Sequence, residues 1–252
     1  MIEIDAITRR FGGLTALDGA SFTVKSGCIT GLIGPNGGGK TTLFNCLSGM
    51  LEPSSGRCLF DGQDITALTP DQIVARGLVR TFQMARGFAR MTVFEHLMLH
   101  GQQQPGERML SALWPGVAAR QRESQLVDAA WQVAKRLGLD FVIDHKVTQI
   151  SGGQKKLLEI GRALMASPRM ILLDEPMAGV NPSLRNQIAD HLSALRAQGL
   201  TLLLIEHDMT LIKALCDEVI VMAQGRFLAR GSFAQIAADP RVQEAYLGRS
   251  QS

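Results

Sequence analysis

Apolar and polar residues alternate with the period of β-strands in the first third of this chain. Residues 2–7, 20–24, 28–33, 56–60 and 78–82 are short apolar or alternating runs of strand length. Asp61-Gly62 follows one of these runs and is a turn signal. A helix is expected over residues 40–48, directly after a glycine-rich stretch. This part of the chain therefore predicts several strands and one early helix.

The period changes to that of helices between residues 92 and 165. Leu126, Ala130, Val133 and Leu137 recur there at helical spacing. Strands over residues 170–173, 200–205 and 219–222 then alternate with helices over 182–196 and 209–215. Such alternation predicts a mostly parallel sheet covered by helices. We interpret the chain as one domain, an α/β core of residues 1–83 and 166–252 interrupted by a helical insertion over 84–165.

The composition limits the classes of protein to which this chain can belong. A 252-residue chain with 46% hydrophobic and 19% charged residues is typical of a globular protein. No apolar run approaches the roughly 20 residues of a membrane helix, and the N-terminus lacks a secretory signal. The four cysteines are Cys28, Cys46, Cys58 and Cys216, and they are scattered without a CxxC pair. This spacing favours reduced thiols in the cytosol over a zinc site or disulfides.

Positive charge is concentrated in the middle of the chain. Residues 76–162 carry 13 Lys and Arg against 7 Asp and Glu, although the formal charge of the whole chain is only +3. Such a segment can face anionic lipid headgroups or acidic loops of a membrane partner. The charges are spread out, so a solvated helical face is an equal alternative.

A glycine-rich stretch between a predicted strand and a predicted helix has the pattern of a phosphate loop. Glycines let backbone N–H groups converge on the β- and γ-phosphates of a nucleoside triphosphate. Lysine then places a positive charge on those phosphates, and the following hydroxyl is a Mg²⁺ ligand. The stretch predicts binding of a nucleoside triphosphate and Mg²⁺ by the run Gly34, Pro35, Asn36, Gly37, Gly38, Gly39, Lys40, Thr41 and Thr42.

Two adjacent carboxylates end the apolar strand over residues 170–173. Because this strand belongs to the predicted parallel sheet, Asp174 and Glu175 are expected at the sheet edge beside the phosphate loop. Asp174 is predicted to hold Mg²⁺ through water, and Glu175 to act as general base for the attacking water. An ordinary strand-end turn is the alternative for this pair taken alone.

A Ser-Gly-Gly run opens the last helix of the insertion. A helix N-terminus with a hydroxyl and two unhindered backbone amides is an anion receptor, and the same residues can cap the helix. The long helical insertion separates this run from the phosphate loop of its own chain. We therefore predict that it contacts the γ-phosphate of ATP bound to a second subunit, through Ser151, Gly152, Gly153 and Gln154.

These motifs in this order resemble those of ATP-binding cassette (ABC) ATPases over essentially the whole chain. The resemblance implies a P-loop NTPase core with a mostly parallel sheet, an antiparallel β subdomain and an inserted α-helical subdomain. It also implies that His207 is the switch histidine at the γ-phosphate, that Gln83 reaches Mg²⁺ and the water, and that Phe11 stacks on adenine. A core position is the alternative for Phe11. Asn181 stands where Asp is commoner in the family, which puts the detail of dimer coupling in doubt.

Several segments further resemble the ATPase subunits of branched-chain amino-acid uptake systems. They lie at residues 80–83, 91–95, 158–164, 178–182, 206–209 and 239–248, and the last reads as a short closing helix. The implied protein works peripherally at the cytoplasmic face of the cell membrane with permease subunits, a second identical or homologous ATPase subunit and, indirectly, a periplasmic solute-binding protein. The alternatives are an ATPase of lipid or lipopolysaccharide export and a soluble ABC protein acting on nucleic acid. We expect no nucleic-acid partner, because the chain lacks an extended Lys/Arg run.

Cations and large apolar residues lie together in the segment 84–96. Exposed apolar surface of this kind favours a partner. We expect the segment to receive a cytoplasmic helix of the permease, with Phe88 and Met91 as apolar contacts. The alternative is that Met91, Val93, Phe94 and Leu97 anchor a helix to the core of the insertion.

Overall fold

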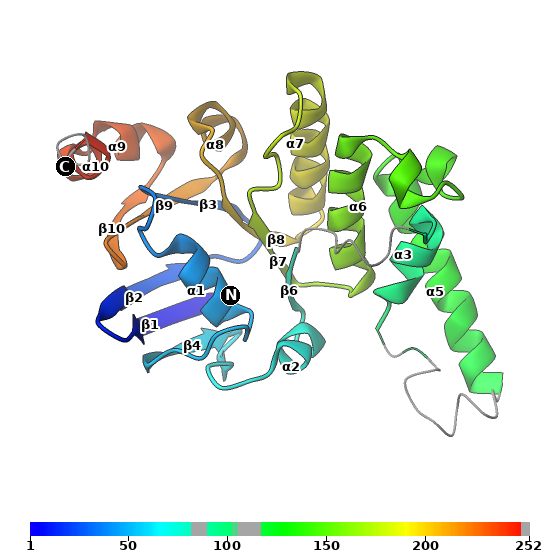
Figure 1. The fold of residues 1–252 in the computed structure, drawn as a ribbon, viewed down its shortest axis with the longest axis horizontal. Helices are drawn as coiled ribbons and strands as arrows, with labels where there is room; N and C mark the ends of the chain where they lie inside the picture. Colours follow the sequence, from blue (N-terminus) through cyan, green and yellow to red (C-terminus); the bar gives the residue numbers. More distant parts are fainter. Residues whose placement is uncertain (82–89, 103, 105–116, 248–252) are drawn as a thin grey trace. The chain divides into compact units, whose positions relative to one another are not determined.

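The structure is a computed structural model that describes residues 1–81, 90–102, 104 and 117–247 (Figure 1). The chain forms two compact units. The first, here called the core unit, comprises Met1–Arg80, Arg169–Ala178 and Leu192–Ser252. The second, the helical unit, comprises Thr81–Pro168 and Gly179–His191. The predicted limits of the helical insertion, residues 84 and 165, stay a prediction.

A six-stranded, mostly parallel sheet forms one layer of the core unit. Its strand order is β10-β9-β3-β8-β7-β6, and β10 alone is antiparallel to its neighbour. Every residue of β3 and β8 is buried, which explains their uninterrupted apolar sequence. The strands span Ile29–Ile33 (β3), Leu78–Arg80 (β6), Met170–Asp174 (β7), Thr201–Ile205 (β8), Glu218–Ala223 (β9) and Arg226–Gly231 (β10).

A four-stranded antiparallel sheet forms a second layer of the core unit, in the order β2-β1-β4-β5. Its strands span Ile2–Phe11 (β1), Leu14–Val24 (β2), Ser55–Phe60 (β4) and Gln63–Asp64 (β5). Ile2, Ile4 and Ile7 point to the buried face of β1. Both sheets agree with the predicted fold class. β1 and β2 are longer than expected because their exposed ends pair as a hairpin that the apolar pattern alone does not mark.

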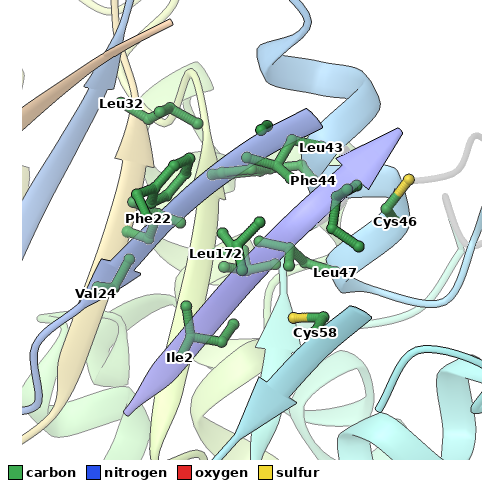
Figure 2. Packing of buried hydrophobic residues seen from close by; sticks show 14 of the residues in the cluster. Ile2, Phe22, Val24, Leu32, Leu43, Phe44, Cys46, Leu47, Cys58 and Leu172 are labelled. Carbon is green, nitrogen blue, oxygen red and sulfur yellow. The ribbon is translucent and has the colours of Figure 1, made fainter. Parts of the chain in front are cut away.

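Helix α1 (Lys40–Leu47) fills the space between the two sheets. Its Leu43, Phe44 and Leu47 are fully buried and belong to one apolar cluster with Phe22 of β2 and Leu172 of β7 (Figure 2). The cluster also contains Cys46 and Cys58, which are free thiols. Burial raises the pKa of Cys58 to about 12, so it packs as a small apolar residue. Helix α1, which carries the end of the phosphate loop, is therefore anchored in this buried apolar cluster.

The other helices of the core unit are short. They are α2 (Pro70–Ala75), α8 (Met209–Leu215), α9 (Phe233–Ala238) and α10 (Pro240–Leu247), and α7 (Pro182–Ala197) belongs partly to each unit. Helix α8 confirms the helix predicted over residues 209–215, and α10 confirms the short closing helix predicted within residues 239–248. Strand β10 and helices α2 and α9 were not expected from the sequence. The two helices have six residues each, which is too few to display a helical period.

Within its described residues, the helical unit contains α3 (Val93–Leu99), α5 (Val117–Arg136), α6 (Gly152–Met165) and the short 3₁₀ helices η3 (Asp140–Val142) and η4 (Val147–Gln149). Helices α3, α5 and α6 pack on one another. Val93 and Leu97 are fully buried and anchor α3 to this core, as the alternative to a docking role predicted for them, whereas Met91 and Phe94 are only half-buried. None of the described helices has the length and apolar composition that crossing a lipid bilayer requires.

Candidate functional site

The phosphate loop connects the buried strand β3 to helix α1. Gly34 has a φ of 147°, and a Cβ atom added there would lie 1.9 Å from the carbonyl oxygen of Met222 in β9. A side chain is therefore excluded by the neighbouring strand as well as by the backbone conformation. Helix α1 begins after Gly39 without a side-chain cap, so backbone amides alone form its positive N-terminal end. This is the arrangement that an anion-binding loop needs.

The side chain of Lys40 lies within the phosphate loop and bonds to its backbone. Its side chain is buried, and Nζ donates hydrogen bonds to the carbonyl oxygens of Gly34 at 2.8 Å and Pro35 at 3.0 Å. The ammonium group is thus held at the centre of the loop rather than extended into solvent.

Glu175 and His207 meet at the edge of the parallel sheet. Glu175 follows the last residue of β7, His207 lies two residues beyond β8, and these two strands are neighbours. The Nε2 atom of His207 lies 3.0 Å from Oε1 of Glu175. Both side chains line a cavity of about 250 Å³ with Ile205 and the phosphate-loop residues 36–42. The structure therefore brings the expected base, the expected switch histidine and the phosphate loop to one cavity.

The backbone at Glu175 is strained. Its φ is 48°, a left-handed value that costs about 1–3 kcal/mol for a residue with a side chain. The Glu175 N–H donates to the carbonyl of Ile205 at 3.0 Å, and the N–H of Ala178 donates to the carbonyl of Glu175 at 3.2 Å. These bonds fix the turn that directs the Glu175 side chain toward the phosphate loop. Strain of this kind is common at functional sites.

Asp174 is paired with a cation of its own chain. Its Oδ2 accepts from Nη2 of Arg80 at 2.7 Å, and the Arg80 guanidinium also donates to Oδ1 of Asn45 in α1. Asp174 and Thr41 offer a carboxylate and a hydroxyl oxygen, which are the hard donors that suit Mg²⁺. The residues that the sequence assigned to Mg²⁺ thus fit the ion chemically. Gln83, the third of them, lies outside the described residues.

Phe11 lies at the end of β1 and is 45% exposed. This exposure is incompatible with the alternative of a core phenylalanine. The guanidinium of Arg9 stands 4.8 Å from the ring centroid, which is cation–π distance. An exposed aromatic ring is what stacking on adenine requires, and that role stays a prediction.

Ser151 caps helix α6 as expected. Its Oγ accepts from the N–H of Gln154 at 3.2 Å, and Oε1 of Gln154 accepts from the N–H of Ser151 at 2.8 Å. This reciprocal capping box fixes the first turn of the helix. The Ser151 hydroxyl proton is not used as a donor in these two bonds, so capping and donation to an external anion are compatible.

Gly152 and Gly153, the two glycines of the Ser-Gly-Gly run (here called the signature run), differ in their surroundings. A Cβ atom at Gly153 would lie 1.4 Å from Cδ2 of Leu184 in α7, whereas a Cβ atom at Gly152 meets nothing within 4 Å. Gly153 therefore allows α6 and α7 to approach closely. No neighbour within the described chain requires Gly152 to lack a side chain.

Replacing Gly153 with Ala is expected to destabilise the fold by about 1–3 kcal/mol, because the added methyl group overlaps Leu184. The free energy of unfolding in urea measures the effect. Gly152→Ala is the matched control and should leave this free energy within about 0.5 kcal/mol of the wild type. Equal stability of both variants would contradict the packing argument.

Asn181 marks the start of α7. Its Oδ1 accepts from the N–H of Leu184 at 3.0 Å, which is the N-cap bond expected before Pro182. Asn supplies this cap without the negative charge that Asp would add.

Comparison with known proteins decides the family. A model of the ABC transporter family matches residues 17–178, which include the phosphate loop, the signature run, Asp174 and Glu175. The chain belongs to this family. A second model, described as branched-chain amino acid ATP-binding cassette transporter, matches residues 228–251.

Relatives in this family match the chain over almost its whole length. A probable branched-chain amino acid transport ATP-binding protein of Methanocaldococcus jannaschii is 40% identical, over 98% of this chain and 97% of the relative. The high-affinity branched-chain amino acid transport ATP-binding protein BraF of Pseudomonas aeruginosa is 37% identical, over 99% and 98%. The solved ADP conformation of an ATP-binding cassette of an ABC transporter has 40% identity and a TM-score of 0.86, covering 98% of each chain. This ABC protein is an ATP hydrolase and binds ATP.

Three residues at or beside the cavity were not expected from the sequence. Arg80 neutralises Asp174, Tyr246 lines a pocket with Ile33 at the start of the phosphate loop, and the buried Glu206 accepts hydrogen bonds from the backbone of Met177 and His207. All three lie in segments that carry the family resemblance, at residues 80–83, 206–209 and 239–248, but no role was predicted for them. The pairing of β6 with β7 brings Arg80 to Asp174, and no local pattern could have indicated that.

Proposed function

We propose that this ABC protein powers the import of branched-chain amino acids or closely related small solutes. Two features support the proposal: full-length relatives that carry this description, and a separate match of residues 228–251 to a branched-chain amino acid cassette model. The second match is the observation that carries it, because it lies outside the motifs that all ABC ATPases share. No observation favours lipid export or nucleic-acid binding.

In the proposed hydrolysis step, the residues around the cavity have separate roles. Backbone amides of the phosphate loop and the Lys40 ammonium bind the β- and γ-phosphates of ATP. Thr41 and Asp174 hold Mg²⁺, which neutralises charge on the phosphates when it is bound. Glu175 takes a proton from the attacking water, and His207, 3.0 Å from Glu175, orients the base toward that water. Gln83 is assigned to the same water by family resemblance.

The proposed working unit is a pair of cassettes. The side chains of Glu175 and His207 are 46% and 50% exposed, so a single chain leaves the reacting groups open to solvent. Exclusion of water strengthens electrostatic catalysis, and a second subunit can supply it. Ser151, Gly152, Gly153 and Gln154 form the contact that this subunit makes with the γ-phosphate. The second subunit is an identical or a homologous cassette.

Permease subunits complete the proposed assembly at the cytoplasmic face of the membrane, and a periplasmic binding protein delivers the solute to them. The predicted permease contact at Phe88 lies outside the described residues. Within the described part of the segment, the Phe94 ring lies 6.5 Å from the ring of Trp131, which is 40% exposed. These two aromatic rings form a partly exposed surface of the helical unit that suits an apolar partner helix.

Deleting the gene should abolish high-affinity uptake of radiolabelled leucine by the cells that carry it, because ATP binding and hydrolysis drive the transport step. A plasmid copy of the wild type should restore uptake, and a Glu175→Gln copy should not. Uptake of lysine is the control for general damage. Unchanged leucine, isoleucine and valine uptake in the deletion strain would contradict the proposed solute class.

A further inference from the structure

Glu206 is a buried carboxylate between the two strands that carry Glu175 and His207. It directly follows β8, and only 6% of its surface is exposed. His207 beside it faces the cavity, so successive side chains point to opposite sides here. The residues that line the cavity do not include Glu206. Its function must therefore act through other groups.

The Glu206 side chain bonds to backbone on both sides of the site. Its Oε1 accepts from the N–H of Met177 at 2.9 Å, and its Oε2 accepts from the N–H of His207 at 3.3 Å. Met177 lies two residues after Glu175, in the turn that leaves β7. One carboxylate thus joins the segment of the expected base to the segment of the expected switch histidine.

The turn at Glu175 needs such a connection. A left-handed φ of 48° persists only where the surroundings hold the backbone in place. The bond from the Glu175 N–H to the carbonyl of Ile205 fastens one end of the turn to β8. The bond from the Met177 N–H to Glu206 fastens the other end to the residue that follows β8. The spacing between the Glu175 and His207 side chains is fixed by these two attachments.

The chemistry of the carboxylate suits this task. Ionised Glu has two oxygens that only accept, so it serves two N–H donors at once. Gln has one accepting oxygen, and its amide group would present a donor to one of the two N–H groups. Burial raises the pKa of Glu206, and the two backbone hydrogen bonds oppose this shift by favouring the charged form.

We propose that Glu206 is a positioning residue for ATP hydrolysis. Its carboxylate sets the relative placement of Glu175 and His207 by accepting hydrogen bonds from the backbone that follows β7 and from the backbone that follows β8. The inference rests on the proposed roles of Glu175 and His207. It goes beyond them by assigning a function to a side chain that touches neither the nucleotide loop nor the cavity.

The test compares Glu206→Gln and Glu206→Ala in steady-state ATPase assays. Misplacement of reacting groups by about 1 Å costs on the order of 100-fold in rate. We expect kcat to fall about 10-fold for Gln and about 100-fold for Ala. The KM for ATP should stay within about twofold, because the phosphate loop and Lys40 are unchanged.

Thr201→Val is the matched control. Thr201 is fully buried at the opposite end of the same strand, and its Oγ1 accepts from the backbone N–H of Gly27 at 2.9 Å. This substitution also removes an acceptor from a backbone N–H group, so it should lower the melting temperature. Because it lies away from Glu175 and His207, it should leave kcat near the wild-type value.

Two results would overturn the proposal: a wild-type kcat in both Glu206 variants, or a fall in kcat that is accompanied by an equal rise in KM and matched by Thr201→Val. If the Ala variant does not fold, the Gln variant decides by the same criteria. Failure of the assigned base is distinguishable, because Glu175→Gln would then retain turnover whatever the Glu206 variants do. Failure of the proposed solute class would appear as unchanged leucine uptake in the deletion strain and would leave these ATPase results unaffected.

Discussion

Replacing Glu175 with Gln is expected to lower kcat for ATP hydrolysis at least about 100-fold while ATP binding is retained. Gln keeps the size of the side chain but cannot accept a proton from water. The phosphate loop, Lys40 and the apolar contacts of α1 are unaffected, so the affinity for ATP should change less than about twofold. Phosphate release measures turnover, and fluorescence of a labelled ATP analogue measures binding.

Glu123→Gln is the control for this experiment. Glu123 is an exposed residue of α5 in the helical unit, and its replacement removes the same charge without touching the cavity. Its kcat should equal that of the wild type. Turnover near the wild-type value in Glu175→Gln would mean that another group accepts the proton, and the assignment of the base would be wrong.

Replacing Gly152 with Asp should abolish nucleotide-dependent dimerisation without harming the folded chain. A Cβ atom at position 152 meets no atom within 4 Å, and an acidic residue in the first turn of a helix interacts favourably with the helix dipole. In a dimer closed around ATP, the same carboxylate would face the γ-phosphate. Repulsion between these two anions opposes closure.

Light scattering after size exclusion, performed with MgATP on the Glu175→Gln background, measures this effect. The background chain should form dimers at millimolar MgATP, and the additional Gly152→Asp change should leave it monomeric. A melting temperature equal to that of the background, or slightly higher, shows that the fold is intact. Dimers of the double variant at the same MgATP concentration would contradict the predicted role of the signature run.

The sequence predicted the ATP cavity well because its residues follow a simple rule of topology. Parallel strands place their carboxyl ends at one edge of a sheet. Asp174 ends β7, Glu175 and His207 follow β7 and β8, and the phosphate loop follows β3. The proximity of Asp174, Glu175 and the phosphate loop follows from the apolar runs of these strands, whereas His207 was indicated by the family resemblance.

The residues that the sequence did not reveal interact in ways that have no local pattern. Glu206 is held by backbone N–H groups, which every residue except proline possesses. Arg80 meets Asp174 because β6 is the neighbour of β7 in the sheet, and strand order is not encoded in a spacing. The two signature glycines look equivalent in the sequence, yet only Gly153 is required by packing against Leu184.

The position of β3 in the sheet has a consequence for synthesis of the protein on the ribosome. Residues 29–33 are made early, but Ile29 pairs with Leu202 of β8, and Thr30 pairs with Glu218 of β9. Both neighbours of β3 therefore emerge only in the last quarter of translation. Until then the nascent phosphate loop lacks both strands that flank β3, so we expect nucleotide binding only when the chain is nearly complete.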